Sequence, residues 1–169
     1  MAAVFTVEDG TGVADANSYI TLADADQYVD NTSGDSTWTA PATDANKEKA
    51  LRLATQYVDA EYADQWKGTA SADNQSLDWP RAGVTLRDGY GIDSDEIPQA
   101  LKDAVCELAV DYLVNGTLMA DVSSPGSVKR KQAGPVSIEY FGADQVAWRR
   151  LTVNLLSDLI VSGDVVRRA

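Results

Sequence analysis

Four acidic residues gather in one glycine-containing stretch of the sequence, where carboxylates could bind a hard cation such as calcium. They are Asp88, Asp93, Asp95 and Glu96. Their spacing does not match the calcium loop in which aspartates alternate before a glycine and a glutamate closes the site. We therefore interpret these acids as turn-forming and helix-capping residues, and we expect no metal and no cofactor.

The same stretch contains aromatic and cationic side chains that could bind nucleic acid. Trp79, Arg81, Arg87 and Tyr90 resemble the stacking platform with cationic flanks that single-strand binders use. The alternative is structural: Trp79 packs on the helices, Pro80 stiffens the chain and Arg81 pairs with a nearby acid. Because the net charge is −12, we favour the structural interpretation, in which Trp79, Arg81 and Tyr90 pack a connector that leads to the next helix.

Catalytic chemistry has little support in this sequence. The chain of 169 residues contains no histidine, which removes the commonest general base near neutral pH and the commonest zinc ligand. Its one cysteine, Cys106, cannot form an internal disulfide and lies in an apolar helical pattern, which is typical of a buried structural thiol. We therefore expect a protein of the reducing cytoplasm that is not an enzyme.

Charge is distributed unevenly along the chain. Residues 1–128 carry 7 basic and 22 acidic side chains, whereas residues 129–169 carry 7 basic and 4 acidic ones. The basic residues cluster as Lys129-Arg130-Lys131, Arg149-Arg150 and Arg167-Arg168. An acidic body would repel a nucleic-acid backbone, and a basic C-terminal third could instead make head-to-tail contacts between copies. Solvated charge that keeps the protein soluble is the alternative left open.

Hydrophobic spacing predicts one mainly α-helical domain over residues 1–169. We expect a small antiparallel bundle of about four helices, with a β-hairpin inserted before the last helix and extended segments at both ends. The N-terminal arm would span residues 1–20 and the bundle residues 21–160. The hairpin would span residues 128–141 and a C-terminal tail residues 161–169.

Capping residues locate the first two predicted helices. Thr21 is an N-cap with Asp24 at the third helical position, and a polar loop over residues 31–36 follows this short helix. A second helix begins near Thr43 and runs to about Trp66. Its charged residues lie mostly opposite its apolar face: Lys47, Glu48, Lys49, Arg52, Asp59 and Glu61.

Two further helices complete the predicted bundle. Pro98 sits in the first turn of the third helix, Ser94 or Asp95 caps it, and Asn115-Gly116 ends it. Asp144 caps a final helix through about Ile160. The inner face of this last helix is expected to hold Trp148, Leu151, Leu155 and Leu159.

Several segments resemble a family of phage and prophage proteins often labelled DnaT-like. They include VEDGTGVADANSYITLADADQYV, ALRLATQYVD, WKGT, LDWPRAGVTLRDGYGIDSDEIP and VKRKQAGPVSIEY. The resemblance runs from about Val7 to Tyr140. It implies single-stranded DNA binding in primosome assembly.

The order of elements also resembles the head–tail connector, or adaptor, proteins of tailed phages. This resemblance implies a homo-oligomeric ring, expected to be a dodecamer, beneath the portal protein at the head–tail interface of the virion. The ring would contact a tail completion or terminator protein, and genomic DNA would pass through its lumen without specific contact. Portal docking would use Val161, Asp164, Val165, Val166, Arg167 and Arg168. A hairpin facing neighbouring copies or the lumen would use Lys129, Arg130, Lys131, Val136, Ile138 and Tyr140.

The acidic body favours the connector over the DNA binder at this stage, because an acidic lumen lets DNA slide without sticking. We therefore expect a structural virion protein made in the host cytoplasm, without catalytic activity and without membrane contact. The alternative is a DnaT-like single-stranded DNA-binding protein.

Overall fold

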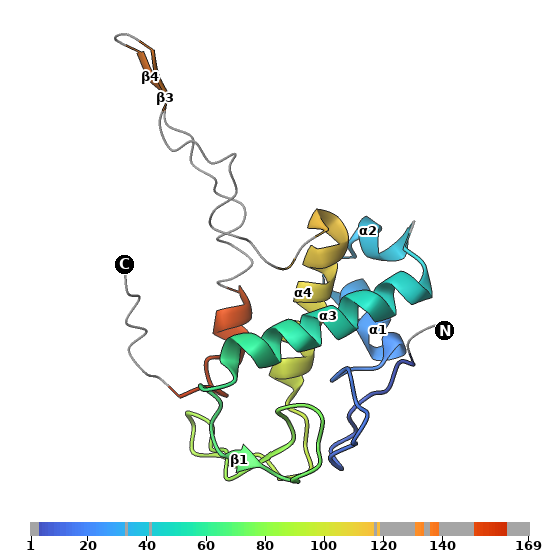
Figure 1. Ribbon diagram of the computed structural model, residues 1–169, viewed down its shortest axis with the longest axis vertical. Helices are drawn as coiled ribbons and strands as arrows, with labels where there is room; N and C mark the ends of the chain where they lie inside the picture. Colours follow the sequence, from blue (N-terminus) through green and yellow to red (C-terminus); the bar gives the residue numbers. More distant parts are fainter. Residues whose placement is uncertain are drawn as a thin grey trace.

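The computed structural model describes residues 4–32, 34–40, 42–116, 118, 131–133, 136–138 and 151–161, and these are mainly helical (Figure 1). The helices are α1 (Leu22–Asn31), α2 (Ser36–Thr39), α3 (Asp44–Tyr62) and α4 (Gln99–Asn115), followed by a helical segment over residues 151–156. β1 (Thr69–Ala70) pairs antiparallel with β2 (Arg81–Ala82), and β3 (Lys131–Ala133) pairs antiparallel with β4 (Val136–Ile138). The prediction of a mainly helical fold with a hairpin before the last helix is confirmed.

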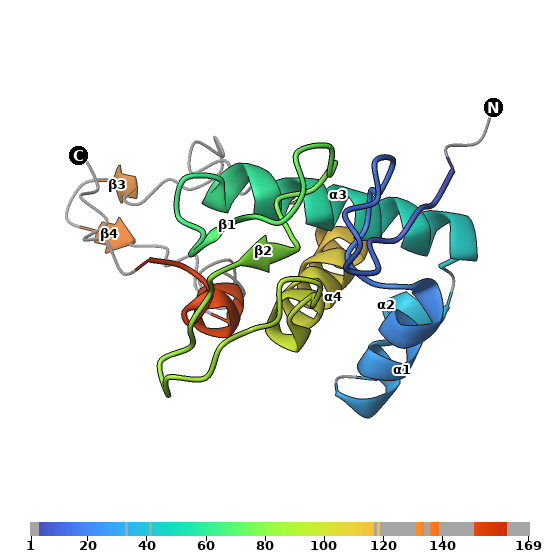
Figure 2. The same cartoon turned by 90° about the horizontal axis from the view of Figure 1, so that it is seen from below.

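α3 and α4 cross at the centre of the bundle, with α1 and α2 on one side and the 151–156 segment on the other (Figures 1 and 2). Leu51 and Val58 of α3 and Leu101 and Val105 of α4 are buried with no exposed surface. Each such side chain contributes about 1.5–3 kcal/mol relative to an exposed one. This pair of helices therefore provides about half of the buried apolar residues of the described core.

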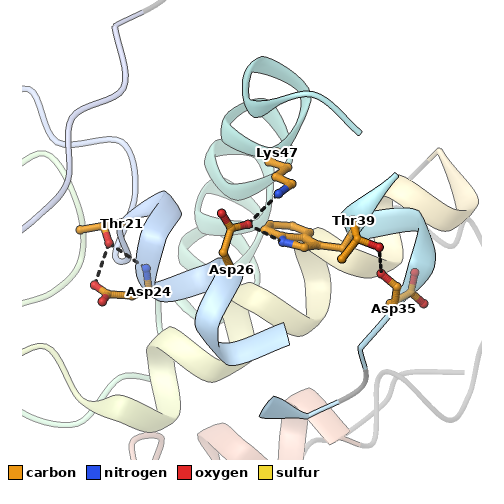
Figure 3. Close-up of polar contacts among 7 residues, drawn as sticks. Thr21, Asp24, Asp26, Asp35, Thr39 and Lys47 are labelled. Atoms are coloured by element: carbon orange, nitrogen blue, oxygen red, sulfur yellow. Dashed lines mark hydrogen bonds and ion pairs between the residues drawn. The ribbon is translucent and has the colours of Figure 1, made fainter. Parts of the chain in front are cut away.

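Polar contacts fix α1 against its neighbours (Figure 3). The Thr21 hydroxyl accepts the Asp24 N–H at 3.1 Å, so the predicted N-cap is confirmed. The Asp26 carboxylate accepts hydrogen bonds from Lys47 Nζ at 2.7 Å and from Trp38 Nε1 at 2.8 Å. Lys47 is buried and does not lie on a solvated face as expected. The unpredicted helix α2 carries Trp38 into this contact, where the sequence indicated a polar loop leading up to it.

The ends of α3 and α4 differ from their predicted positions. α3 stops at Tyr62 rather than near Trp66, and the Trp66 ring turns into the core, where its centroid lies 5.8 Å from that of Trp79. Pro98 is itself the N-cap of α4, without a side-chain capping bond, so neither Ser94 nor Asp95 caps this helix. Gly116 ends it as predicted, with a left-handed φ of 73° that a glycine adopts without strain.

The last helical segment is rotated relative to the prediction. Leu151 is 39% exposed, whereas Thr152, Leu156 and Leu159 are buried. Thr152 and Leu156 are one helical turn apart on the same face, so within residues 151–156 the buried positions lie one residue beyond the Leu151 and Leu155 that we expected. Leu155 is half-buried and Leu159 is buried as predicted. Asp144 and Trp148 lie outside the described residues.

The N-terminal arm folds around one buried carboxylate instead of extending freely. Glu8 is 2% exposed, and its oxygens accept the N–H groups of Gly10, Gly12 and Val13 at 3.0, 2.9 and 2.8 Å. Gly10 has φ 103°, and a Cβ there would lie 1.8 Å from the carbonyl oxygen of Asp95. The arm is therefore held closely against the segment between β2 and α4. Among the described residues, no helix has the length and apolarity needed to span a membrane.

Candidate functional site

The predicted packing of Trp79 is confirmed. Its side chain has no exposed surface, and its ring meets Trp66 edge-on at an interplanar angle of 89°. The backbone N–H of Trp79 donates to the hydroxyl of Tyr19 at 3.2 Å. A base could not stack on this indole without opening the core, so Trp79 is not part of a surface platform for nucleic acid.

Contrary to expectation, Arg81 forms no ion pair with an acid within the described part of the chain. Its guanidinium donates to three backbone carbonyls, those of Lys67 at 2.8 Å, Gly68 at 2.9 Å and Asp78 at 3.1 Å. These bonds join the two ends of the β1–β2 region, where Ala82 pairs with Thr69. The guanidinium therefore satisfies carbonyls that the turn between α3 and β1 leaves without partners.

Tyr90 does not pack on the bundle, and the prediction that it does is wrong. It is 74% exposed because the turn that contains it closes on itself, with the Leu86 N–H donating to the Tyr90 carbonyl at 2.8 Å. Arg87 Nη2 lies 2.9 Å from a carboxylate oxygen of Asp158. The four residues of the candidate stacking platform therefore point to different partners and form no common surface.

The four acidic residues of the connector are all exposed. Within the described ranges, no three or more histidine, cysteine, aspartate or glutamate side chains come together in a way that could hold a metal ion. The Asp93 carbonyl accepts the Glu96 N–H at 3.1 Å, which closes a turn before α4. Cys106 is buried, and burial raises the pKa of its thiol well above the ordinary value, as suits an inert structural cysteine.

A cleft of about 590 Å³ lies between the arm, α3 and the connector. Its wall on α3 is a stripe of residues at helical spacing, and residues of the arm and the connector line the rest of the cleft. The lining residues are Ala16, Asn17, Lys49, Arg52, Leu53, Thr55, Gln56, Asp59, Ala60, Ser76 and Leu77. Sequence analysis placed the charged members of this set on a solvent-facing side of the helix and did not identify them as a site.

The end of the cleft nearer the start of α3 is cationic. Lys49 Nζ lies 5.9 Å from the centroid of the Tyr112 ring, and the Arg52 guanidinium lies 6.0 Å from that of Phe5. Arg52 Nη1 is 3.9 Å from a carboxylate oxygen of Glu48, beyond hydrogen-bond distance. The aromatic rings hold both cations beside the cleft through cation–π attraction.

The other end of the cleft holds a half-buried carboxyl group. Asp59 accepts a hydrogen bond from the Tyr19 hydroxyl at 2.6 Å and one from the Asp78 N–H at 3.3 Å. Burial raises the pKa of Asp59 to about 7; the charge of Asp78 adds to the rise, while the hydrogen bonds from Tyr19 and from the Asp78 N–H and the charge of Arg81 oppose it. A carboxyl with this pKa is in the range of a general base. Because both of its oxygens accept bonds from the fold itself, we assign it a structural role.

Most residues of the expected docking tail and hairpin fall outside the described part of the chain. Val161 is 56% exposed, and its N–H donates to the Gln65 carbonyl at 2.7 Å. In the hairpin, Lys131 pairs with Ile138 and Ala133 with Val136. Outside the described residues lie Lys129, Arg130, Tyr140, Asp164, Val165, Val166, Arg167 and Arg168.

Comparison with known families matches residues 3–168 to a family described as "Putative DnaT-like ssDNA binding protein". The chain belongs to this family. No curated protein and no solved structure matches the chain in the corresponding comparisons. The family description favours the alternative of our sequence analysis, and the expectation of a virion head–tail connector that binds a portal is wrong.

Proposed function

We propose that this protein binds single-stranded DNA and attracts it through its basic C-terminal third. The family match over residues 3–168, with its description of single-stranded DNA binding, carries this proposal. The sequence supports it, because residues 129–169 have a net charge of +3, from 7 basic and 4 acidic side chains. Tyr140, Phe141 and Trp148 lie among these cations, and aromatic rings between cations suit bases that stack and phosphates that need neutralising.

The acidic body sets the strength of the interaction. Residues 1–128 have a net charge of −15, from 7 basic and 22 acidic side chains, and they repel the phosphate backbone. Binding by the isolated protein is therefore weak, independent of base sequence and sensitive to salt. For single strands, the logarithm of the affinity falls with the logarithm of salt concentration with a slope of about −0.7 per neutralised phosphate.

Fluorescence anisotropy of a labelled oligothymidylate, titrated at several salt concentrations, tests the proposal. Replacing Lys129, Arg130 and Lys131 together by alanine should weaken binding and make the salt slope shallower by about 2. A matched variant with arginine at positions 129 and 131 keeps the charge and should bind like the wild type. If the wild type fails to bind the oligonucleotide at low salt, the proposal is wrong.

The absence of catalytic activity, the self-assembly into a ring and the synthesis in a bacterial cytoplasm stay predictions. Size measurements with and without oligothymidylate would address the ring. A single-strand binder that assembles along DNA would grow in size only when the strand is present. A preformed ring would have the same size in both conditions.

A further inference from the structure

Two buried polar atoms beside the cleft between the arm, α3 and the connector make no hydrogen bond within the described residues, although one of them, Arg52 Nη1, lies 3.9 Å from a Glu48 carboxylate oxygen. Thr55 is fully buried, and its Oγ1 makes no hydrogen bond to any described residue. Nη1 of Arg52 is a buried atom that likewise makes no hydrogen bond to any described residue. Both residues line the cleft. A buried polar atom without a partner costs about 1–3 kcal/mol, so native proteins keep few of them and often use them to bind a ligand.

The cleft has the size and the polarity of a ligand site. Its volume of about 590 Å³ falls within the roughly 300–1,000 Å³ typical of small-molecule pockets. Lys49 and Asp59 mark its two ends, roughly 15 Å apart along α3 at the helical rise per residue. Between these ends, the amide group of Gln56 lies among apolar walls formed by Leu53 and Leu77. The amide of Asn17 also lines the cleft, but it already donates to the Val4 carbonyl and accepts the Thr6 N–H.

This arrangement fits one nucleotide better than a simple anion. A phosphate needs cationic donors, which Lys49 and Arg52 provide at one end. A base needs flat apolar contact and hydrogen-bonding groups on its edge, which the middle of the cleft provides. The raised pKa of Asp59 leaves its carboxyl about half neutral at pH 7, so repulsion of a phosphate from that end is weak.

We propose that this cleft binds one nucleotide of a single DNA strand, with the phosphate at Lys49 and Arg52 and the base directed towards Thr55, whose hydroxyl has no accessible surface in this structure and is reached only when the side chains that cover it move. This inference rests on the proposed function, and it adds a contact that is separate from the basic C-terminal third. The cleft anchors one unit of the strand, and the cations of residues 129–169 attract the rest of it.

Two substitutions in the cleft and one outside it test the inference by oligothymidylate anisotropy at fixed salt. Arg52→Ala removes a charged donor and should weaken binding about tenfold or more. Thr55→Val should weaken it about threefold or more while leaving the melting temperature unchanged or higher, because the methyl group replaces an unpartnered hydroxyl. Arg87→Ala removes an equal charge outside the cleft and should change affinity by less than about twofold.

If Arg52→Ala does not fold, a second variant, Arg52→Lys, still tests the inference. Arg52→Lys keeps the charge but lacks the planar fork of the guanidinium, so it should bind more weakly than the wild type while keeping its salt slope. If Arg52→Ala and Arg87→Ala weaken binding equally and Thr55→Val has no effect, the cleft is not a nucleotide site, although the proposed function stands. If the wild type binds no oligothymidylate at all, both proposals fail.

A nuclear magnetic resonance titration with thymidine 5′-monophosphate separates the nucleotide from its phosphate. We expect amide shifts concentrated at Asn17, Thr55 and Leu77, and weaker or absent shifts with inorganic phosphate. Equal shifts with phosphate alone would show an anion site that does not recognise the base, and would overturn the inference. Shifts confined to residues outside the cleft would overturn it as well.

Discussion

The half-buried carboxyl of Asp59 makes the stability of this protein depend on pH in an unusual direction. Its pKa is about 7 in the folded protein, against an ordinary value of 3.8. Between these two values the folded protein holds a proton that the unfolded chain has released. Stability from this group is therefore greatest at acid pH and falls as the pH rises towards 7.

The magnitude follows from the size of the pKa shift. A shift of about three units at about 1.36 kcal/mol per unit corresponds to roughly 4 kcal/mol of penalty when the buried carboxyl is fully ionised. A change from pH 5 to pH 8 covers the part of the range between the two pKa values that runs from pH 5 to about 7, which is about two pH units. It should therefore lower the free energy of unfolding by roughly 2.5 kcal/mol. The groups around Asp59 are Tyr19, Asp78 and Arg81. They act on its pKa in both directions, and the value of about 7 includes all of these effects.

Replacing Asp59 by asparagine removes this titration. The amide oxygen still accepts the hydrogen bond from Tyr19, so the fold should persist. In urea unfolding, the stability of the variant relative to the wild type should improve by roughly 2.5 kcal/mol from pH 5 to pH 8. Asp9→Asn is the control: bonds from Thr11 lower the pKa of Asp9, so its titration lies below this range. An Asp59→Asn protein with the pH dependence of the wild type would refute a buried, neutral carboxyl.

Two further changes test the packing of the arm and of α1 by chemical unfolding. Gly10→Ala should lower the free energy of unfolding by at least roughly 2 kcal/mol more than Gly89→Ala does. Both glycines have positive φ, but only Gly10 is close to the Asp95 carbonyl. Equal effects of the two substitutions would contradict this close contact. Asp26→Ala should lower the free energy of unfolding by about 2 kcal/mol, because it leaves Lys47 buried without its carboxylate; this is less than the loss of one partner costs in a fully buried pair. Asp26→Asn should have a smaller effect. Equal stability of the wild type and Asp26→Ala would contradict a role for the pair.

Local signals predicted the parts of the fold that local physics determines. Thr21 caps α1 because a threonine hydroxyl can accept the N–H three residues on, and Gly116 ends α4 because only glycine enters the left-handed region without strain. The end of α3 depends instead on a distant contact. Its apolar pattern continues to Trp66, but that ring leaves the helix to meet Trp79 in the core, and no signal within the helix indicates this.

The cleft could not be predicted from the sequence because the arm covers what looks like a solvent face. Lys49 and Arg52 have the spacing of an exposed charged stripe, which is the usual position of such residues. The arm reaches this face because the Glu8 carboxylate gathers three backbone N–H groups and so folds the segment before Asn17. A glutamate followed by two glycines was the available signal, but its partners are backbone groups, which no side-chain motif reveals.

The choice between a connector and a DNA binder failed in sequence analysis because net charge was treated as a property of the whole molecule. Electrostatic attraction is local: at physiological ionic strength exposed charges act over about 8 Å. Half of the chain's 14 basic residues lie in residues 129–169, and they attract phosphates locally even though the acidic body lowers the overall affinity. An acidic protein can therefore bind a phosphate backbone through one basic segment. Its acidic body would then discourage nonspecific wrapping and leave the contact to the segment and, in our proposal, to one nucleotide in the cleft.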